Sequence, residues 1–134
     1  MRFMVDTHIL IWALNNPARI HSDISNILRN EDTEIHYSQI SLWEIAIKYG
    51  LGKLDLKGHE PEEFYQAVGE SFLQCEALDS EALITSHRLP LKHKDPFDRM
   101  LVWQCIKGGY TLLSADDKLK AYEENGLKLI LNTF

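Results

Sequence analysis

The chain has 134 residues, 45% of them hydrophobic and 25% charged, which is the composition of one folded globular domain spanning residues 1–134 and excludes a disordered or collagen-like chain. Its net charge of -6 argues against broad electrostatic capture of a polyanion, although a cluster of carboxylates that binds divalent cations would also make a protein acidic. Cys75 and Cys105 form no CxxC pair, which favours a reducing compartment. Asp6 interrupts any signal peptide, and no apolar run approaches membrane-spanning length. We therefore expect a cytoplasmic protein outside the membrane.

The first half of the chain predicts two short strands, each followed by helical patterns. Apolar residues at intervals of three and four indicate the helices, and Asn15-Asn16-Pro17 and Gly50-Leu51-Gly52 end two of them. Ser22 is the expected N-cap of the second helix. The strands are expected at 2–6 and 34–38, and the helices at 8–14, 22–30 and from 40 to 50.

The second half continues the alternation. Asp79 is expected to cap one helix, and Asp95 with Pro96 to begin another that ends at Gly108-Gly109. Such alternation implies right-handed βαβ crossovers and a largely parallel sheet covered on both faces. The helices are expected at 61–73, 79–88, 96–108 and 116–124, and the strands at 75–78, 110–114 and 127–131.

Four acids occupy the positions where a parallel sheet places its ligands, which is just after a strand or in the first turns of the next helix. They are Asp6, Glu44, Asp98 and Asp116. Carboxylates brought this close repel one another, and Mg²⁺ or Mn²⁺ would compensate that charge. A pair of such ions can activate a water and stabilise the leaving oxygen of a phosphodiester. The acids therefore predict metal-dependent phosphodiester hydrolysis.

Two of these acids also have an interpretation in local structure. Ser41 and Glu44 have the spacing of a capping box, so the first could be an N-cap and the second its reciprocal partner. Asp95 is a good N-cap, which leaves Asp98 as either a partner of the helix dipole or a metal ligand. These alternatives stay open on the local sequence.

The other two acids differ in how easily local structure explains them. Asp116 and Asp117 could simply begin a helix. Asp6 is harder to explain in this way, because Thr7 is available as the cap at the same place. Asp6 is therefore the acid that points most directly to a site.

A basic strip precedes the Asp95 turn. Residues 87–94 contain Arg88, Lys92 and Lys94 and no acid, so they are candidates for positioning phosphates beside the metal, joined by Lys48, Lys53 and Lys57. An ordinary solvated loop is the alternative. The histidines show no metal-ligand spacing and are expected mostly at the surface. The tryptophans lie among aliphatic residues and are expected to pack in the core.

Four segments together resemble the PIN-domain ribonucleases, in particular the VapC-type toxins of bacterial toxin-antitoxin pairs. They are Met-Val-Asp-Thr-His at 4–8, Ile-Ser-Leu-Trp-Glu-Ile-Ala-Ile-Lys at 40–48, Asp-Pro-Phe-Asp-Arg-Met-Leu-Val at 95–102 and Leu-Leu-Ser-Ala-Asp at 112–116. Each is weak alone, but they occur in family order and span nearly the whole chain.

The resemblance implies a three-layer α/β/α domain with a mainly parallel sheet, Mg²⁺- or Mn²⁺-dependent RNA cleavage, a homodimer and neutralisation by a VapB-like antitoxin. By position, the family's acids fall on Asp6, Glu44, Asp98 and Asp116. Thr7 and Ser114 supply hydroxyls near the metal, and Asp95 lies at the border of the site. The choice between Asp116 and Asp117 stays open, and the fourth acid is the family's least essential.

Two other functions remain as alternatives. A receiver-like signalling domain also binds Mg²⁺ in an acidic pocket, but it would have paired acids after the first strand and a Lys after the last. Here Asp6 is followed by Thr7-His8, and the last strand ends at Leu131-Asn132. A catalytically inactive PIN module that only binds partners is the second alternative, and the presence of all four acids argues against it.

Overall fold

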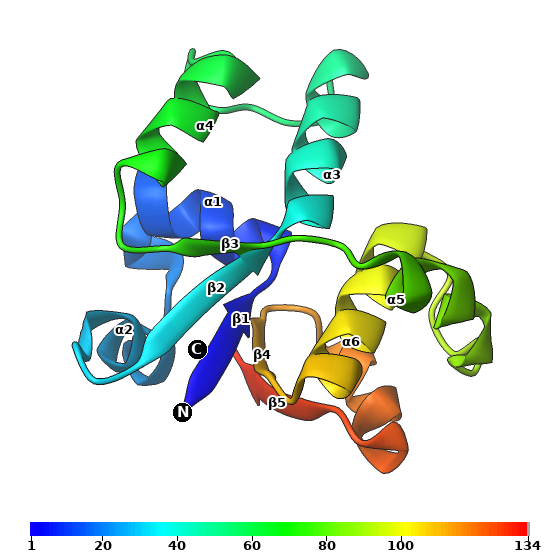
Figure 1. Ribbon diagram of the computed structural model, residues 1–134. Coiled ribbons are helices and arrows are strands. Elements are labelled where there is room, and N and C mark those ends of the chain that lie inside the picture. The colour runs from blue at the N-terminus through cyan, green and yellow to red at the C-terminus, as the bar shows by residue number, and fades with distance from the viewer. Residues whose placement is uncertain (134) are drawn as a thin grey trace.

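A five-stranded sheet forms the centre of the computed structural model, which describes residues 1–133 (Figure 1). The strands lie in the order β3-β2-β1-β4-β5, and every neighbouring pair is parallel, as predicted. The strands are β1 Arg2–Val5, β2 Glu34–Ser38, β3 Gln74–Glu76, β4 Thr111–Ser114 and β5 Lys128–Leu131.

Helices connect the strands and follow the expected order. The α-helices are α1 Thr7–Asn15, α2 Ser22–Arg29, α3 Gln39–Gly50, α4 Pro61–Gly69, α5 Ser80–Thr85 and α6 Pro96–Gly108; the 3-10 helices are η1 Pro17–Arg19, η2 Ser86–Arg88 and η3 Asp117–Asn125. Within residues 1–133, no helix is long and apolar enough to cross a membrane.

Helix ends differ from the expectations in three places. Helix α4 ends at Gly69 instead of residue 73, and the segment expected as one helix from 79 to 88 divides into α5 and η2. The cap of α2 is His21, whose Nδ1 accepts the backbone N–H of Asp23 at 3.2 Å, so Ser22 is a helical residue and not the N-cap. His21 has the extended backbone that an N-cap requires, and Ser22 already lies inside the helix.

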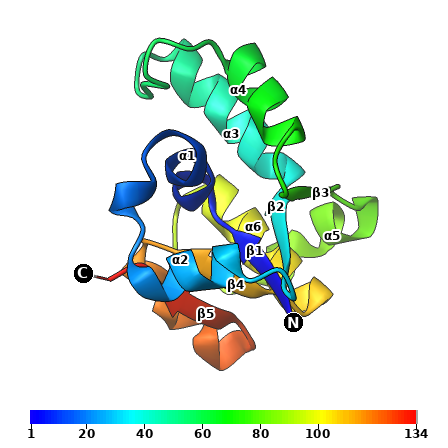
Figure 2. The ribbon, with the colours of Figure 1, turned by 90° about the vertical axis from the view of Figure 1, so that its left-hand side faces the viewer.

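The sheet separates two hydrophobic cores, because successive side chains of a strand point to opposite faces. Phe3 and Val5 pack with residues of α1, α2, α3 and α4, whereas Met4 packs with residues of α5, α6 and η3. Helices therefore cover both faces, and the three-layer α/β/α architecture is confirmed (Figures 1 and 2). Figure 2 shows α3 and α4 beside each other at one end of the molecule.

The strand order creates a crevice between β1 and β4. The chain leaves β1 toward β2 on one side and leaves β4 toward β5 on the other, so the connections diverge at this point. Ligands of parallel α/β sheets bind at such points, outside the carboxyl ends of the strands. The backbone N–H of Asp6 donates to the carbonyl of Leu113 at 2.9 Å and joins the ends of the two strands.

Tyr122, a fully buried residue of η3, holds the loop that leads to α6. Its hydroxyl donates to the carbonyl of Pro90 at 2.8 Å and accepts the backbone N–H groups of Lys92 and His93 at 3.1 and 3.0 Å. One side chain thus satisfies three backbone groups of a segment without regular structure.

We expect Tyr122→Phe to lower the free energy of unfolding by about 1–3 kcal/mol, because it leaves these partly buried backbone groups without their partner. Chemical denaturation measures the change. The matched control is Tyr65→Phe, since Tyr65 is 57% exposed and should leave the stability nearly unchanged. Equal stability of the two variants would contradict the role assigned to the Tyr122 hydroxyl.

Candidate active site

A cavity of about 280 Å³ opens at the carboxyl ends of the strands and contains all four predicted acids. They come from four separate segments: the turn after β1, helix α3, helix α6 and the turn after β4. The residues that line the cavity are Asp6, His8, Trp12, Glu44, Lys48, Asp95, Asp98, Ala115 and Asp116.

Asp6 is buried and both of its carboxylate oxygens accept hydrogen bonds. Oδ1 accepts the backbone N–H of Ile9 at 2.8 Å, and Oδ2 accepts the hydroxyl of Ser114 at 2.6 Å. Asp6 is therefore the N-cap of α1, and the expectation that Thr7 would take this role is wrong, because Thr7 already lies inside the helix. Burial raises the pKa of Asp6. This acid combines a capping role with a place in the cavity wall.

Glu44 is buried in the middle of α3 and is held by two side chains. The hydroxyl of Thr7 donates to Oε1 at 2.5 Å, and the ammonium group of Lys48, one turn further along the helix, pairs with Oε2. Burial lowers the pKa of Lys48, but the hydrogen bond and the charge of Glu44 outweigh this and raise it. The Glu44 carboxylate is thus fixed in place, with its charge balanced on one side.

The capping-box interpretation of Glu44 is wrong. The N-cap of α3 is Ser38, whose hydroxyl accepts the backbone N–H of Ile40 at 3.1 Å. Ser41 is fully buried inside the helix, with its hydroxyl 2.9 Å from that of Thr7. Glu44 is too far along α3 to interact with the cap, so it contacts α1 instead.

The two acids near the start of α6 have different roles. Asp95 is the N-cap, with Oδ1 accepting the backbone N–H of Phe97 at 2.9 Å. Asp98 follows in the first turn, and its carboxylate forms no hydrogen bond within residues 1–133. Burial raises the pKa of Asp98 to about 7, and the charges of Asp95, Glu44 and Asp6 add to the effect. Asp98 is the acid in this cavity whose oxygens are most available to a ligand.

The end of β4 supplies the last acid and links it to the first. The hydroxyl of Ser114, which donates to Asp6, also accepts the backbone N–H of Asp116 at 3.0 Å. Asp116 caps η3 through Oδ1, which accepts the backbone N–H of Lys118 at 3.0 Å. Asp117 is exposed and does not line the cavity, so the geometry favours Asp116 over its neighbour.

His93 lies beside these acids. The sequence pattern had predicted that most histidines, this one included, lie at the surface. Its Nδ1 accepts the backbone N–H of Asp95 at 3.1 Å, so in the neutral ring the proton lies on Nε2. Nε2 is 2.9 Å from Oδ2 of Asp116 and 3.6 Å from Oδ2 of Asp98. One nitrogen of His93 and one carboxylate oxygen each of Asp98 and Asp116 lie within 4.8 Å of one another, so the two acids are close enough to bind one metal beside the His93 ring. The one feature of the sequence that could have indicated His93 as a site residue is its position two residues before Asp95, the N-cap of α6.

The sequence model of the PIN domain matches residues 3–125. The chain belongs to the PIN domain family. No curated protein matches its sequence.

Solved structures share the fold of this PIN domain at low sequence identity. VapBC2 from Rickettsia felis, bound to a DNA fragment from its promoter, gives a TM-score of 0.72 at 20% identity over 98% of each chain. VapBC-1 from nontypeable Haemophilus influenzae gives 0.67 at 15% identity over 100% of each chain. DNA-bound VapBC from Salmonella typhimurium gives 0.65 at 21% identity over 99% of each chain. At these identities the likeness establishes the shared fold.

The receiver-like alternative is not supported for this PIN domain. Receivers have the strand order 2-1-3-4-5, whereas the order here is 3-2-1-4-5. The single acid after β1 and the absence of a Lys after β5 within residues 1–133 agree with this difference.

The donor set of the cavity fits a hard divalent cation. Carboxylate oxygens are the ligands that Mg²⁺ and Mn²⁺ prefer, and Asp6, Asp98, Asp116 and Glu44 offer them within one cavity. Burial raises the pKa of Asp6, and burial together with the charges of Asp95, Glu44 and Asp6 raises that of Asp98, so a compensating cation would favour both ionised carboxylates. His93 would then orient Asp116 through the Nε2–H group.

The basic strip of residues 87–94 lies differently from the expectation. The ammonium group of Lys92 contacts the carbonyl of Ala121 and the side chains of Glu124 and Asn125, so it binds η3 instead of facing the acidic cavity. Arg88 and Lys94 are exposed and do not line that cavity. Their contact with RNA phosphates stays a prediction.

Core packing is the wrong prediction for Trp43. Its side chain is 60% exposed and lies edge-on to Phe97, with ring centroids 5.5 Å apart. The buried positions of α3 are taken by residues such as Ser41 and Ile45, which leaves Trp43 on the outer side. Trp12 is half-buried and lines the acidic cavity.

Proposed function

We propose that the protein is a metal-dependent endoribonuclease that acts as the toxin of a toxin-antitoxin pair in the cytoplasm. The observation that carries the proposal is the convergence of four acids, from four segments far apart in the sequence, on one cavity at the diverging point of a PIN-domain sheet. The available carboxylate of Asp98 adds to it, because a half-buried acid without hydrogen bonds loses part of its hydration and gains from a ligand that binds it.

The residues of the cavity would divide the work as follows. Asp6, Asp98 and Asp116 would hold Mg²⁺ or Mn²⁺, with Glu44 beside them. The bound cation would supply Lewis-acid activation of water and neutralise charge at the leaving oxygen of the phosphodiester. Ser114 keeps the carboxylate of Asp6 in one orientation by donating its hydroxyl proton.

Two further contacts position the remaining acids. Thr7 and Lys48 hold the Glu44 carboxylate from opposite oxygens, so it faces the cavity without swinging away. His93 donates to Asp116 from a ring whose orientation is fixed by the Asp95 backbone. Hydrolysis then needs no nucleophilic side chain, which agrees with the composition of the cavity wall.

A single-stranded RNA oligonucleotide incubated with the purified protein tests the proposal. We expect internal cleavage with Mg²⁺ or Mn²⁺ and none with EDTA, and the DNA oligonucleotide of the same sequence is the comparison. Intact RNA under every metal condition would overturn the nuclease function, and so would cleavage that persists undiminished in EDTA.

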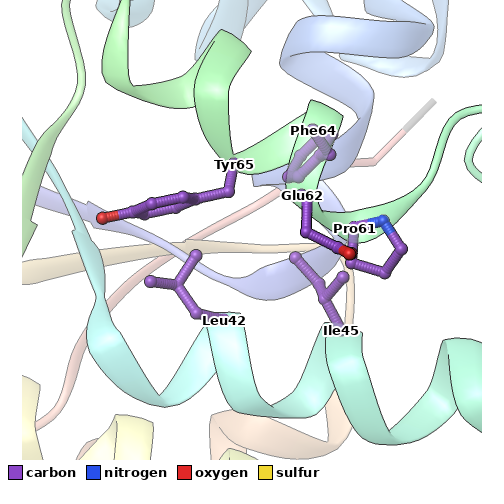
Figure 3. Close-up of a pocket in the computed structure, with 6 residues that line it drawn as sticks. All are labelled: Leu42, Ile45, Pro61, Glu62, Phe64 and Tyr65. Atoms are coloured by element: carbon purple, nitrogen blue, oxygen red, sulfur yellow. The ribbon is translucent and has the colours of Figure 1, made fainter.

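An apolar groove between α3 and α4 supports the antitoxin half of the proposal. Leu42 and Ile45 from α3 face Phe64 and Tyr65 from α4 across a cavity of about 280 Å³ (Figure 3). We assign this groove to an amphipathic segment of a VapB-like antitoxin, since an apolar helix face packs into grooves of this kind. Repeating the RNA cleavage assay with the co-expressed partner should show loss of cleavage, and Tyr65→Glu should restore it.

A homodimer is part of the same proposal. Large apolar side chains stay exposed on the isolated chain, including Trp43, Ile84 and Leu91, and an interface between two copies would remove such side chains from water.

A further inference from the structure

A second cavity lies next to the acidic one and shares two residues with it. It measures about 370 Å³, which falls in the range of sites for small ligands. His8 and Trp12 line both cavities, so the two form one continuous surface along α1. We call the second cavity the basic recess, and Ile11, Arg19, Leu54 and Lys57 are among the other residues that line it.

The two cavities have opposite charge. The acidic cavity has five carboxyl groups against the single cation of Lys48, whereas the basic recess has Arg19 and Lys57 against the single carboxylate of Asp55. In a chain with a net charge of -6, the recess therefore concentrates positive charge directly beside the candidate metal-binding acids. The phosphodiester backbone of an RNA strand could run from one cavity to the other, because Arg19 and Lys57 attract its phosphates in the recess and the divalent cation held by the acids would attract them in the acidic cavity.

Flat side chains line the basic recess, and two of them, His8 and Trp12, also line the acidic cavity. The guanidinium group of Arg19 lies over the ring of Trp12, with Cζ 4.3 Å from the ring centroid, and the ring of His8 lies 5.7 Å from that of Trp12. Aromatic rings and guanidinium planes are the surfaces on which proteins stack unpaired bases. Ile11 and Leu54 add apolar wall.

Hydrogen-bond donors in the recess are also available. Within residues 1–133 the Arg19 side chain forms no hydrogen bond, so its N–H groups are free to bind a phosphate. The ammonium group of Lys57 donates to the carbonyl of Asn15 at 2.6 Å, which leaves two of its three protons. Asn15 also lines the recess, and its side-chain nitrogen is a buried donor with no partner in the described part of the chain.

We propose that the basic recess binds one nucleotide of a single-stranded RNA, next to the phosphodiester held at the acidic cavity. The base lies against the Trp12 and Arg19 planes, and the phosphate accepts hydrogen bonds from Arg19 and Lys57. The proposal rests on the ribonuclease function and gives that function a substrate subsite. It also explains how an acidic protein holds RNA, because the recess presents Arg19 and Lys57 at the place where the strand passes.

Binding is measured without metal, so that no cleavage takes place. The probe is a single-stranded oligoribonucleotide of six residues in EDTA, added to the full chain carrying Trp43→Phe and Trp103→Phe, in which Trp12 is the only tryptophan. We expect saturable quenching of the Trp12 fluorescence. In a fluorescence-anisotropy assay with the labelled oligonucleotide, Trp12→Ala should weaken binding about 10- to 100-fold, and Trp12→Phe should restore most of it.

Arg19→Ala tests the recess without altering a side chain of the core, since Arg19 is exposed. We expect it to weaken oligonucleotide binding about tenfold. The matched control is Arg29→Ala, an exposed arginine of α2 outside the recess, which should bind as the wild type does. Equal binding by the wild type, Trp12→Ala and Arg19→Ala would overturn the proposal.

The RNA cleavage assay separates this proposal from the function on which it rests. If the wild type cleaves RNA and the Trp12→Ala and Arg19→Ala variants cleave the same sites with the same KM, the recess is no subsite while the nuclease function stands. If the oligonucleotide quenches Trp12 and Arg19→Ala weakens its binding, but no metal supports cleavage, the recess stands and the nuclease function fails.

Discussion

Asp98→Asn is expected to lower metal-dependent RNA cleavage by more than about 100-fold. The substitution keeps the shape of the side chain and removes the charge of the one acid in the cavity that forms no hydrogen bond within residues 1–133. Loss of residues that only orient metal ligands already costs about 10- to 100-fold, so loss of a direct ligand should cost more. Helix α6 should persist, because Asp95 and not Asp98 is its N-cap.

Initial rates of oligonucleotide cleavage, measured at saturating Mn²⁺, give the size of the effect. The matched control is Asp117→Asn, which removes an exposed acid next to the cavity and should leave the rate within about twofold of the wild type. Circular dichroism checks that both variants fold. Asp98→Asn with wild-type activity would remove Asp98 from the site. A large loss in Asp117→Asn would instead place the fourth acid at 117.

Convergence of the acids could be predicted from the sequence because it depends on the order of elements and not on side-chain detail. Residues that follow parallel strands meet at one edge of the sheet. The register of β1 with β4 pairs Val5 with Leu113, so Asp6 lies beside the carboxyl end of β4. The position of Asp116 after β4 follows from the same rule. The five-stranded parallel sheet and its two helical layers were predictable for the same reason.

Roles that depend on tertiary partners could not be predicted in this way. The spacing of Ser41 and Glu44 fits a capping box, but the partner of Glu44 is Thr7, which is 37 residues away in sequence. Asp6 caps α1 and also lines the cavity. The local sequence around Asp6 therefore cannot show whether this acid serves as a cap, as a site residue or as both.

The same limit explains why His93 was missed. Its loop has no regular structure, and its position depends on the buried hydroxyl of Tyr122 in η3, 29 residues further along. Lys92 lies in the same loop and binds η3, although the local cluster of basic residues suggested a phosphate contact. A basic run predicts charge near a site, but only the packing of the loop decides which cations face the cavity.

The metal-free protein should lose stability as the pH rises from about 4 to about 7. The pKa of Asp98 is about 7 in the folded chain against 3.8 for an exposed aspartate, so the folded state keeps a proton that the unfolded state has already released. The stabilisation that this proton gives is complete below the unfolded pKa and is lost as the pH passes the folded pKa. Ionisation of Asp98 next to Asp95, Glu44 and Asp6 is the physical cause.

Mg²⁺ or Mn²⁺ should reverse this loss, because the cation replaces the proton as the compensating charge. Thermal unfolding in EDTA and at saturating Mn²⁺ measures it. We expect a gain in Tm of at least about 5 °C at about pH 8 and a much smaller gain at about pH 5. Asp98→Asn should raise the Tm of the metal-free protein at the higher pH, and it should remove most of the gain in Tm that Mn²⁺ gives. The control Asp117→Asn should behave as the wild type. A gain that is equal at both pH values, or unchanged in Asp98→Asn, would show that this carboxylate neither carries the proton nor binds the metal.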